Sequence, residues 1–301
     1  MPSHQGAIRI FRFSGIDVFL HWSWFVVAVF ELQLRSGEYS SPLWNALEYL
    51  ALFAIVTMHE FGHSLACRQV GGRAERIVLW PLGGVAYVAP PQRPGATLWS
   101  LAAGPLVNVA LVPVLLGLGR LMGSLGWAET QPDAFALVRA VFFVNLVILA
   151  FNLLPVYPLD GGQILRSLLW YVLGRARSLM VATGLGFLGV LGLAALALRL
   201  RSIWLGILTV FVALNCWSGF QQARQLQALA RLPRRHGYAC PSCAAAPPIG
   251  AFWGCGECGA PFDVFESQAR CPACGVSFGV ARCVDCGQLY PLGEWAGRPA
   301  G

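Results

Sequence analysis

Long stretches of apolar residues dominate the chain between about residues 18 and 220. Six of them approach the roughly 20 residues that a helix needs to cross about 30 Å of hydrocarbon. They lie at residues 18–34, 46–69, 97–123, 135–154, 179–198 and 202–220. This pattern predicts an all-α polytopic membrane protein of about six transmembrane helices, in which the fifth and sixth spans form a tight helical hairpin.

The segment at residues 72–94 is too short, and too broken by Gly and Pro, to cross the bilayer. Two β-prone runs, at residues 76–80 and 85–88, predict a short membrane-embedded β-hairpin that enters from the cytoplasmic face. An exposed strand edge is forbidden in lipid but useful in a cavity, where it would hold an unwound substrate extended. The alternative is an interfacial loop with Trp80 at the headgroups.

The pattern changes after residue 220, where long apolar runs end and cysteines become frequent. Residues 221–236 are polar and helix-prone, and eight of the ten cysteines follow residue 239. We therefore expect three parts: a membrane domain over residues 1–220, a linker helix over 221–236, and a small cysteine-rich cytosolic domain over 237–301.

The composition excludes an ordinary soluble protein. Charged residues make up 12% of the 301 residues, about half the usual share of a soluble chain. All 21 basic residues are arginine, and we attribute the net charge of +7 to that bias rather than to nucleic-acid binding. With the N-terminus inside, thirteen arginines flank the spans on the cytoplasmic side and five on the other. Both termini are therefore expected in the cytoplasm, with the protein in a bacterial or archaeal cell membrane.

Three ionisable residues lie close together inside the second predicted span, in the sequence His59-Glu60-Phe61-Gly62-His63. On a helix, His59 and His63 are one turn apart on the same face, so both imidazoles can bind one Zn²⁺ beside Glu60. A metal-free polar cluster would bring three titratable groups into lipid with no compensating charge. The spacing therefore predicts a catalytic zinc site.

Two histidines and a water leave a tetrahedral zinc one protein ligand short, and Asp160 is the candidate for it. Asp160 follows the fourth span, in a segment where two prolines break the helix and Gly161 and Gly162 permit unusual backbone angles. In the six-span arrangement, Asp160 and both histidines lie toward the cytoplasmic side. The alternative is that Asp160 caps the helix beginning near Gln163.

Two motifs, HEFGH at residues 59–63 and NLLPVYPLDGG at residues 152–162, occur together in this chain. The pair resembles the site-2 protease family of intramembrane zinc metalloproteases. Residues 103–108 resemble that family's G-P-x-x-N element, residues 80–85 its glycine-containing hairpin, and residues 15–21 the start of its first span. The resemblance covers about residues 8–220, but the chain lacks the PDZ or CBS domains of some relatives.

The resemblance implies that His59, His63 and Asp160 bind zinc and that Glu60 is the catalytic base. It also implies the reaction, which is cleavage of a peptide bond within a transmembrane helix of another protein. Zinc-activated water is the nucleophile in this chemistry, and the base takes its proton.

Asn108 and Asn152 are, by resemblance and membrane position, the candidates for oxyanion stabilisation or substrate binding. An interhelical hydrogen bond is the alternative for each. The alternative function for the chain is a catalytically silent membrane scaffold that recruits a partner through its tail. Such a scaffold would need none of the four motif residues.

The tail contains four C-x-x-C pairs, formed by Cys240, Cys243, Cys255, Cys258, Cys271, Cys274, Cys283 and Cys286. Four such pairs provide two sites of four thiolates each, which predicts a double zinc ribbon with two structural zinc ions. Disulfides are the alternative, but the cytoplasm is reducing.

Short loops favour pairing of the C-x-x-C pairs in chain order, the first with the second and the third with the fourth. A loop twice as long costs only about 0.6 kcal/mol more, so an interleaved arrangement stays open. The tail has few large apolar residues, and metal binding is therefore expected to provide most of its folding free energy.

The expected partners are a transmembrane protein substrate and the lipid bilayer. Acidic residues balance the arginines of the tail, so no basic surface indicates DNA or RNA. A cytosolic protein partner is the expected ligand of the zinc ribbons.

Overall fold

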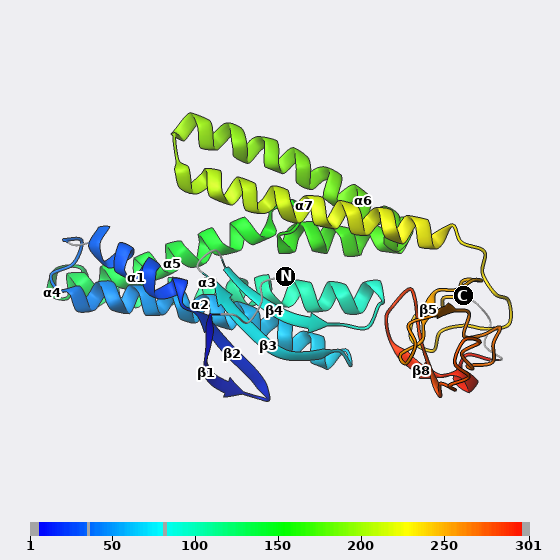
Figure 1. The fold of residues 1–301 in the computed structure, drawn as a ribbon. Coiled ribbons are helices and arrows are strands. Elements are labelled where there is room, and N and C mark those ends of the chain that lie inside the picture. The colour runs from blue at the N-terminus through cyan, green and yellow to red at the C-terminus, as the bar shows by residue number, and fades with distance from the viewer. Residues whose placement is uncertain (1–5, 35–36, 81–82, 297–301) are drawn as a thin grey trace.

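The computed structural model describes residues 6–34, 37–80 and 83–296, and it confirms a mostly helical chain with a small C-terminal domain (Figure 1). Five helices among these residues are long and apolar enough to cross a membrane. They are α2 (Pro42–Gln69), α3 (Pro94–Ser124), α5 (Pro132–Leu153), α6 (Asp160–Leu200) and α7 (Ile203–Ala230). The short helix α4 (Trp127–Thr130) lies between α3 and α5. The five long helices account for the second to sixth predicted spans.

The prediction that residues 18–34 form a single transmembrane helix is wrong. Its residues form strand β2 (Ile16–His21) and then helix α1 (Ser23–Leu34), whose 12 residues extend only about 18 Å. Ile16 and Val18 of β2 are buried, and β2 pairs with a strand on each side in a sheet. Strand pairing at this point therefore replaces the helix that the apolar run predicts.

The segment comprising β2 and α1 nevertheless runs antiparallel to α2. Arg68, near the end of α2, donates a hydrogen bond to the carbonyl of Gly15 (3.0 Å). Tyr49, in the first part of α2, donates one to the carbonyl of Trp24 (2.7 Å). The strand and the short helix together thus pass along α2 in the direction that the six-span arrangement requires.

A four-stranded sheet in the order β1-β2-β3-β4 lies against α2. Its other strands are β1 (Ala7–Phe13), β3 (Arg73–Trp80) and β4 (Gly83–Ala89). β2 and β3 are parallel, whereas β1 and β4 pair antiparallel with their neighbours. The predicted hairpin is present as β3 and β4, although Pro81 and Leu82 at its turn lie outside the described residues. β4 is an edge strand of this sheet.

α6 and α7 form the predicted hairpin, with two departures from the prediction. α6 is kinked at Gly174, whose φ of 75° is left-handed, so the helix that begins at Asp160 and the predicted fifth span are two segments. α7 continues through Ala230, which joins most of the predicted linker helix to the sixth span. Arg234, just beyond α7, forms an ion pair with Asp285 of the tail (2.6 Å).

The C-terminal domain contains two small hairpins, β5 (Trp253–Gly254) with β6 (Pro261–Phe262) and β7 (Val280–Arg282) with β8 (Leu289–Pro291), followed by the 3₁₀ turn η1 (Leu292–Glu294). Phe265 lies at the centre of its core, with ring centroids 5.4 Å from Trp253 and 5.1 Å from Trp295. This aromatic core is larger than the sequence suggested.

Candidate metal centre and active site

His59 and His63 converge with Asp160, which lies about a hundred residues later in the chain. His59 Nε2 lies 3.0 Å and His63 Nε2 lies 3.2 Å from Asp160 Oδ2, and the two Nε2 atoms are 3.1 Å apart. The histidines come from one face of α2, and Asp160 is the first residue of α6. The structure thus brings together the three ligand atoms that the sequence suggests for one metal ion.

The other ring nitrogen of each histidine faces an oxygen atom. His63 Nδ1 lies 2.8 Å from the carbonyl oxygen of Ser100, and His59 Nδ1 lies 2.6 Å from Oδ1 of Asn108. Carbonyl oxygens only accept, so each Nδ1 carries a proton, and with the ring neutral, as a metal ligand must be, the Nε2 lone pair is directed toward Asp160. Two nitrogen lone pairs and a carboxylate oxygen about 3 Å apart repel one another unless a cation lies among them. The set of donors suits zinc, which in catalytic sites takes three protein ligands.

The Glu60 side chain contacts strand β4 of the sheet. Its Oε2 accepts a hydrogen bond from the backbone N–H of Ala86 in β4 (2.9 Å). A Cβ atom at Gly84 would lie 2.3 Å from Cγ of Glu60. A glycine in β4 therefore provides the space in which the carboxylate packs, and the edge strand is held beside the site.

The loop before Asp160 packs tightly against the start of α6. A Cβ atom at Gly161 would lie 2.4 Å from the carbonyl oxygen of Leu153, and one at Gly162 would lie 2.4 Å from the backbone nitrogen of Tyr157. Neither glycine has a positive φ. The twin glycines thus allow close approach of the backbone, and neither uses the left-handed backbone angles that glycine permits.

The two predicted asparagines lie in different environments. Asn108 is fully buried and its amide is engaged by His59, which favours a positioning role over the predicted substrate contact. Asn152 is half-buried at the end of α5 and makes no side-chain hydrogen bond within the described ranges. Sequence reasoning missed Asn145, which donates to and accepts from Asn108. The available signal was one Asn within the apolar run of residues 140–151 of that helix.

A family model matches the part of the chain that forms this site. The model describes peptidase family M50 and matches residues 48–130 and 121–196, which include both motifs. The chain belongs to peptidase family M50. It is thus a member of the site-2 protease family of intramembrane zinc metalloproteases, as its motifs suggested.

Two known proteins similar to this M50 chain are metalloproteases by name. The zinc metalloprotease MJ0392 of Methanocaldococcus jannaschii is 30% identical over 218 residues, which are 72% of this chain and 60% of that protein. The putative zinc metalloprotease Rip3 of Mycobacterium tuberculosis is 31% identical over 237 residues, 73% of this chain and 58% of that protein. The chain thus spans about 60% of the length of these relatives.

A solved structure, the site-2 protease from Methanocaldococcus jannaschii, resembles this fold with a TM-score of 0.52 and 27% identity. The similarity covers 71% of this chain and 95% of that one. The M50 match ends at residue 196, so the cysteine-rich tail lies outside it.

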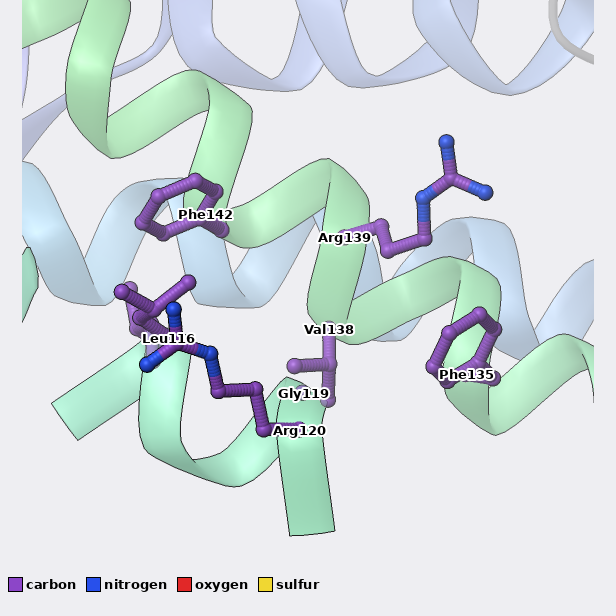
Figure 2. A pocket seen from close by; sticks show the side chains of 8 residues that line it. Leu116, Gly119, Arg120, Phe135, Val138, Arg139 and Phe142 are labelled. Atoms are coloured by element: carbon purple, nitrogen blue, oxygen red, sulfur yellow. The ribbon is translucent and has the colours of Figure 1, made fainter. Parts of the chain in front are cut away.

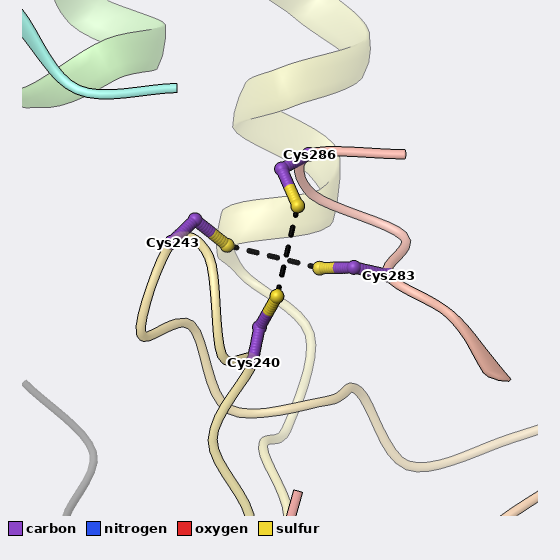
Figure 3. A group of neighbouring side chains, drawn as sticks. All are labelled: Cys240, Cys243, Cys283 and Cys286. Carbon is purple, nitrogen blue, oxygen red and sulfur yellow. Dashed lines mark hydrogen bonds between the residues drawn. The ribbon is translucent and has the colours of Figure 1, made fainter. Parts of the chain in front are cut away.

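The tail beyond the M50 match gathers its eight cysteines into two groups, and the pairing predicted in chain order is wrong. Cys240, Cys243, Cys283 and Cys286 form an outer group from the first and last C-x-x-C pairs (Figure 3). The inner group comprises Cys255, Cys258, Cys271 and Cys274. The arrangement is therefore nested.

Backbone pairing between the two ends of the domain explains the nesting. The N–H of Ala239 donates to the carbonyl of Trp295 (3.0 Å), and Tyr238 bridges to Ala296. These contacts bring the first C-x-x-C pair to the last. Because loop-closure entropy changes only slowly with loop length, pairing and core packing can outweigh it.

Sulfur spacing in both groups suits zinc rather than disulfides. Between the two C-x-x-C pairs of a group, the Sγ–Sγ distances include 3.6 and 3.7 Å in the outer group and 3.5 and 3.7 Å in the inner group. A tetrahedron with Zn–S bonds of about 2.3 Å has edges of about 3.8 Å, whereas a disulfide bond is about 2.05 Å long. All eight cysteines are unbridged.

A groove between α3 and α5 lies apart from these groups (Figure 2). It is lined by apolar side chains and by Arg120 and Arg139, whose guanidinium groups do not point toward one another. No His, Cys, Asp or Glu lines it. The groove therefore offers no catalytic or metal-binding set.

Proposed function

We propose that this chain is an intramembrane zinc endopeptidase, which hydrolyses a peptide bond in or near a transmembrane segment of a substrate protein. The observation that carries the proposal is the convergence of His59, His63 and Asp160 beside Glu60, among helices long and apolar enough to cross a membrane. The similar proteins named as zinc metalloproteases support it.

His59, His63 and Asp160 would hold the catalytic zinc through Nε2, Nε2 and a carboxylate oxygen. Zinc bound there supplies Lewis-acid activation of a water molecule and of the scissile carbonyl. Glu60 takes the proton from the attacking water and passes it to the leaving amine. The Ala86 N–H fixes the orientation of the Glu60 carboxylate during this transfer.

The free edge of β4 would hold the substrate. The N–H of Ala86 donates to Glu60 and not to β3, so the side of the strand that lies away from β3 faces the catalytic carboxylate. A substrate helix that unwinds can add to this edge as a further strand, which places an extended peptide beside Glu60. Asn152, whose side chain has no partner among the described residues, is our candidate for contacting the substrate carbonyl.

We also propose that both termini lie in the cytoplasm and that two structural zinc ions organise the tail. The excess of arginine on one side of the spans supports the orientation. The antiparallel course of β2 and α1 along α2 keeps the number of crossings even. A cytosolic segment of a partner protein is the ligand we expect for the tail.

Cleavage and zinc binding test the catalytic proposal separately. Glu60→Gln should abolish cleavage of membrane proteins while keeping zinc at the histidine site, whereas His59→Ala and Asp160→Ala should lose both. Fragments are compared by mass spectrometry of membranes that contain the wild type or the Glu60 variant, with Glu75→Gln, on strand β3, as the matched control. Undiminished cleavage by the Glu60 variant would refute the mechanism. Absence of cleavage by the wild type on every membrane protein surveyed would favour the silent scaffold.

A further inference from the structure

Asn145 is the one residue of the fully described helix α5 that is buried inside the protein. Its amide lies in an apolar helix, where an unpaired polar group is costly. Two hydrogen bonds satisfy it, and both lead to Asn108 on α3: Asn145 Nδ2 to the backbone oxygen of Asn108 (3.0 Å), and Asn108 Nδ2 to Asn145 Oδ1 (2.8 Å). Among the described residues, the hydrogen bonds of Asn145 therefore reach the metal centre through Asn108.

The direction of each hydrogen bond that links Asn145, Asn108 and His59 follows from the backbone carbonyl of Asn108. A carbonyl oxygen only accepts, so the NH₂ end of Asn145 must face it. The oxygen end of Asn145 then faces the NH₂ end of Asn108. The oxygen end of Asn108 is left for His59 Nδ1, 2.6 Å away, which must carry a proton. The Nε2 lone pair of a neutral His59 consequently points at Asp160 Oδ2.

The proton of His63 is held at Nδ1 without such a series of side-chain hydrogen bonds. Its Nδ1 lies 2.8 Å from the backbone carbonyl of Ser100, whose oxygen cannot exchange places with a donor. The partner of His59, in contrast, is an amide side chain, which has nearly the same shape in both orientations. The orientation of Asn108 must therefore be imposed from elsewhere, and Asn145 is the residue in contact with it.

We infer that Asn145 is a positioning residue of the metal centre, which sets the tautomer of His59 by fixing the amide orientation of Asn108. The inference rests on the proposed role of His59 as a zinc ligand. Without Asn145, Asn108 can turn its NH₂ group toward Nδ1, and the His59 proton then moves to Nε2. An Nε2–H would donate to Asp160 and occupy the position that a metal ion needs.

Zinc affinity in the full-length protein, reconstituted in lipid nanodiscs, provides the first test. Asn145→Leu should weaken zinc binding at the histidine site by about 10- to 100-fold, the usual cost of losing an outer partner of a ligand. Graded chelation releases the three zinc ions in steps, and the step missing from His63→Ala identifies this site. Asn215→Leu, which removes a half-buried Asn of α7 bonded only to its own helix, is the matched control and should change nothing.

A double-mutant cycle separates tautomer control from packing. In Asn108→Asp both side-chain oxygens accept, so either orientation presents an acceptor to His59 and Asn145 has nothing left to fix. Adding Asn145→Leu to Asn108→Asp should therefore weaken zinc binding by less than about threefold. An equal loss in both backgrounds would show a packing effect and overturn the inference.

The tautomer itself can be observed by ¹⁵N NMR of metal-free protein labelled at its five histidines, in an Asp160→Ala background that removes the carboxylate 3.0 Å from His59 Nε2. His59, assigned by its absence when His59→Ala is added, should be protonated at Nδ1 in this background and gain Nε2 protonation when Asn145→Leu is added. Asn145→Ser, which adds no bulk, should do the same if the Leu variant fails to fold. An unchanged tautomer would refute the inference, whereas a wild type that binds zinc but cleaves nothing would refute only the proposed function.

Discussion

Gly104 on α3 lies directly against the imidazole of His63. A Cβ atom there would lie 2.2 Å from His63 Nε2, the ring atom that faces Asp160. Gly104→Ala should therefore displace the ring and weaken zinc binding at the histidine site by at least about 10-fold. Gly117→Ala, on the same helix with no atom within 4 Å of the new methyl group, is the control for titration with a competing chelator. Equal affinities for both variants would contradict this description of the site.

Asp263 in the tail has a carboxylate surrounded by donors at 2.8 to 3.2 Å. These are the backbone N–H groups of Gly250, Phe265 and Glu266 and the guanidinium of Arg235. Burial opposes ionisation, but these donors outweigh it and lower the pKa of Asp263 below its ordinary value. The ionised carboxylate therefore stabilises the fold of the tail.

A variant without this charge should be less stable in a pH-dependent way. At neutral pH, Asp263→Asn should destabilise the tail by about 2 kcal/mol, since it loses charge-assisted hydrogen bonds. A lowered folded-state pKa gives stability that is complete above the unfolded value of about 3.9 and disappears as the pH falls through the folded value. Amide exchange at Gly250 and Phe265 should thus differ between variant and wild type at pH 7, and the difference should shrink as the pH falls below about 3.9. A difference independent of pH would contradict the assignment.

Local spacing explains which site residues could be predicted. His59, Glu60 and His63 form a helical motif, and Asp160 lies in a broken segment, so each carries a signal of its own. Asn145 carries only the signal of a polar residue in an apolar run, because its role depends on the orientation of an amide on another helix. Residues that act through a partner become visible only when the helices are placed.

Among the elements, the loop between α5 and α6 is held by two glycines of the helical hairpin. A Cβ atom at Gly219 of α7 would lie 2.6 Å from Cε1 of Tyr157, and one at Gly186 of α6 would lie 3.0 Å from its carbonyl oxygen. Cys216 Sγ donates to that oxygen (2.8 Å). The α6–α7 hairpin therefore positions the loop that ends at Asp160.

A methyl group added between α7 and Tyr157 should disturb the metal centre by displacing the loop before Asp160. Gly219→Ala should cost about 1 to 3 kcal/mol of stability through overpacking and reduce zinc affinity by displacing the loop before Asp160. Gly206→Ala adds the same methyl group to α7 where no atom lies within 4 Å. Thermal unfolding in detergent and zinc retention are measured for both, and a harmless Gly219 variant would show that the loop is fixed elsewhere.

The apolar runs predicted five of the crossing elements because each is long enough to span the bilayer alone. The first run misled because hydropathy does not distinguish a buried strand from a buried helix. Just before this run, apolar residues alternate with Arg9 and Arg12, a pattern typical of a strand with one exposed face. The start of the run itself forms β2, which pairs with β3. That partner lies more than fifty residues away in the sequence, so local pattern could not reveal the pairing.

For the whole molecule, the proposed orientation predicts where reporters will be found. A reporter fused after Arg235 should be cytoplasmic, and one inserted within residues 37–41 should lie on the opposite side of the membrane. The reason is that β2 and α1 complete one crossing before α2 begins the next. Alkaline phosphatase and green fluorescent protein fusions report the two sides, and a reversed pair of signals would overturn the orientation.

The nested cysteine groups predict which substitutions share a metal ion. Cys240→Ser and Cys283→Ser should each remove the same zinc ion, so the double variant should lose no more than either single variant. Cys240→Ser combined with Cys255→Ser should lose two. Zinc content by mass spectrometry of the intact protein decides between this result and pairing in chain order, in which Cys240 and Cys255 would share one ion.

The nested arrangement also sets the order in which the two cysteine groups are completed during synthesis. As the chain leaves the ribosome, all four cysteines of the inner group emerge before Cys283, so that group can load metal while the outer group is still half made. The first pair, Cys240 and Cys243, is synthesised earliest yet waits longest for its partners. A chain cut short between the third and fourth pairs would therefore carry one finished metal site and one exposed dithiol, the form most open to oxidation and to quality-control proteases.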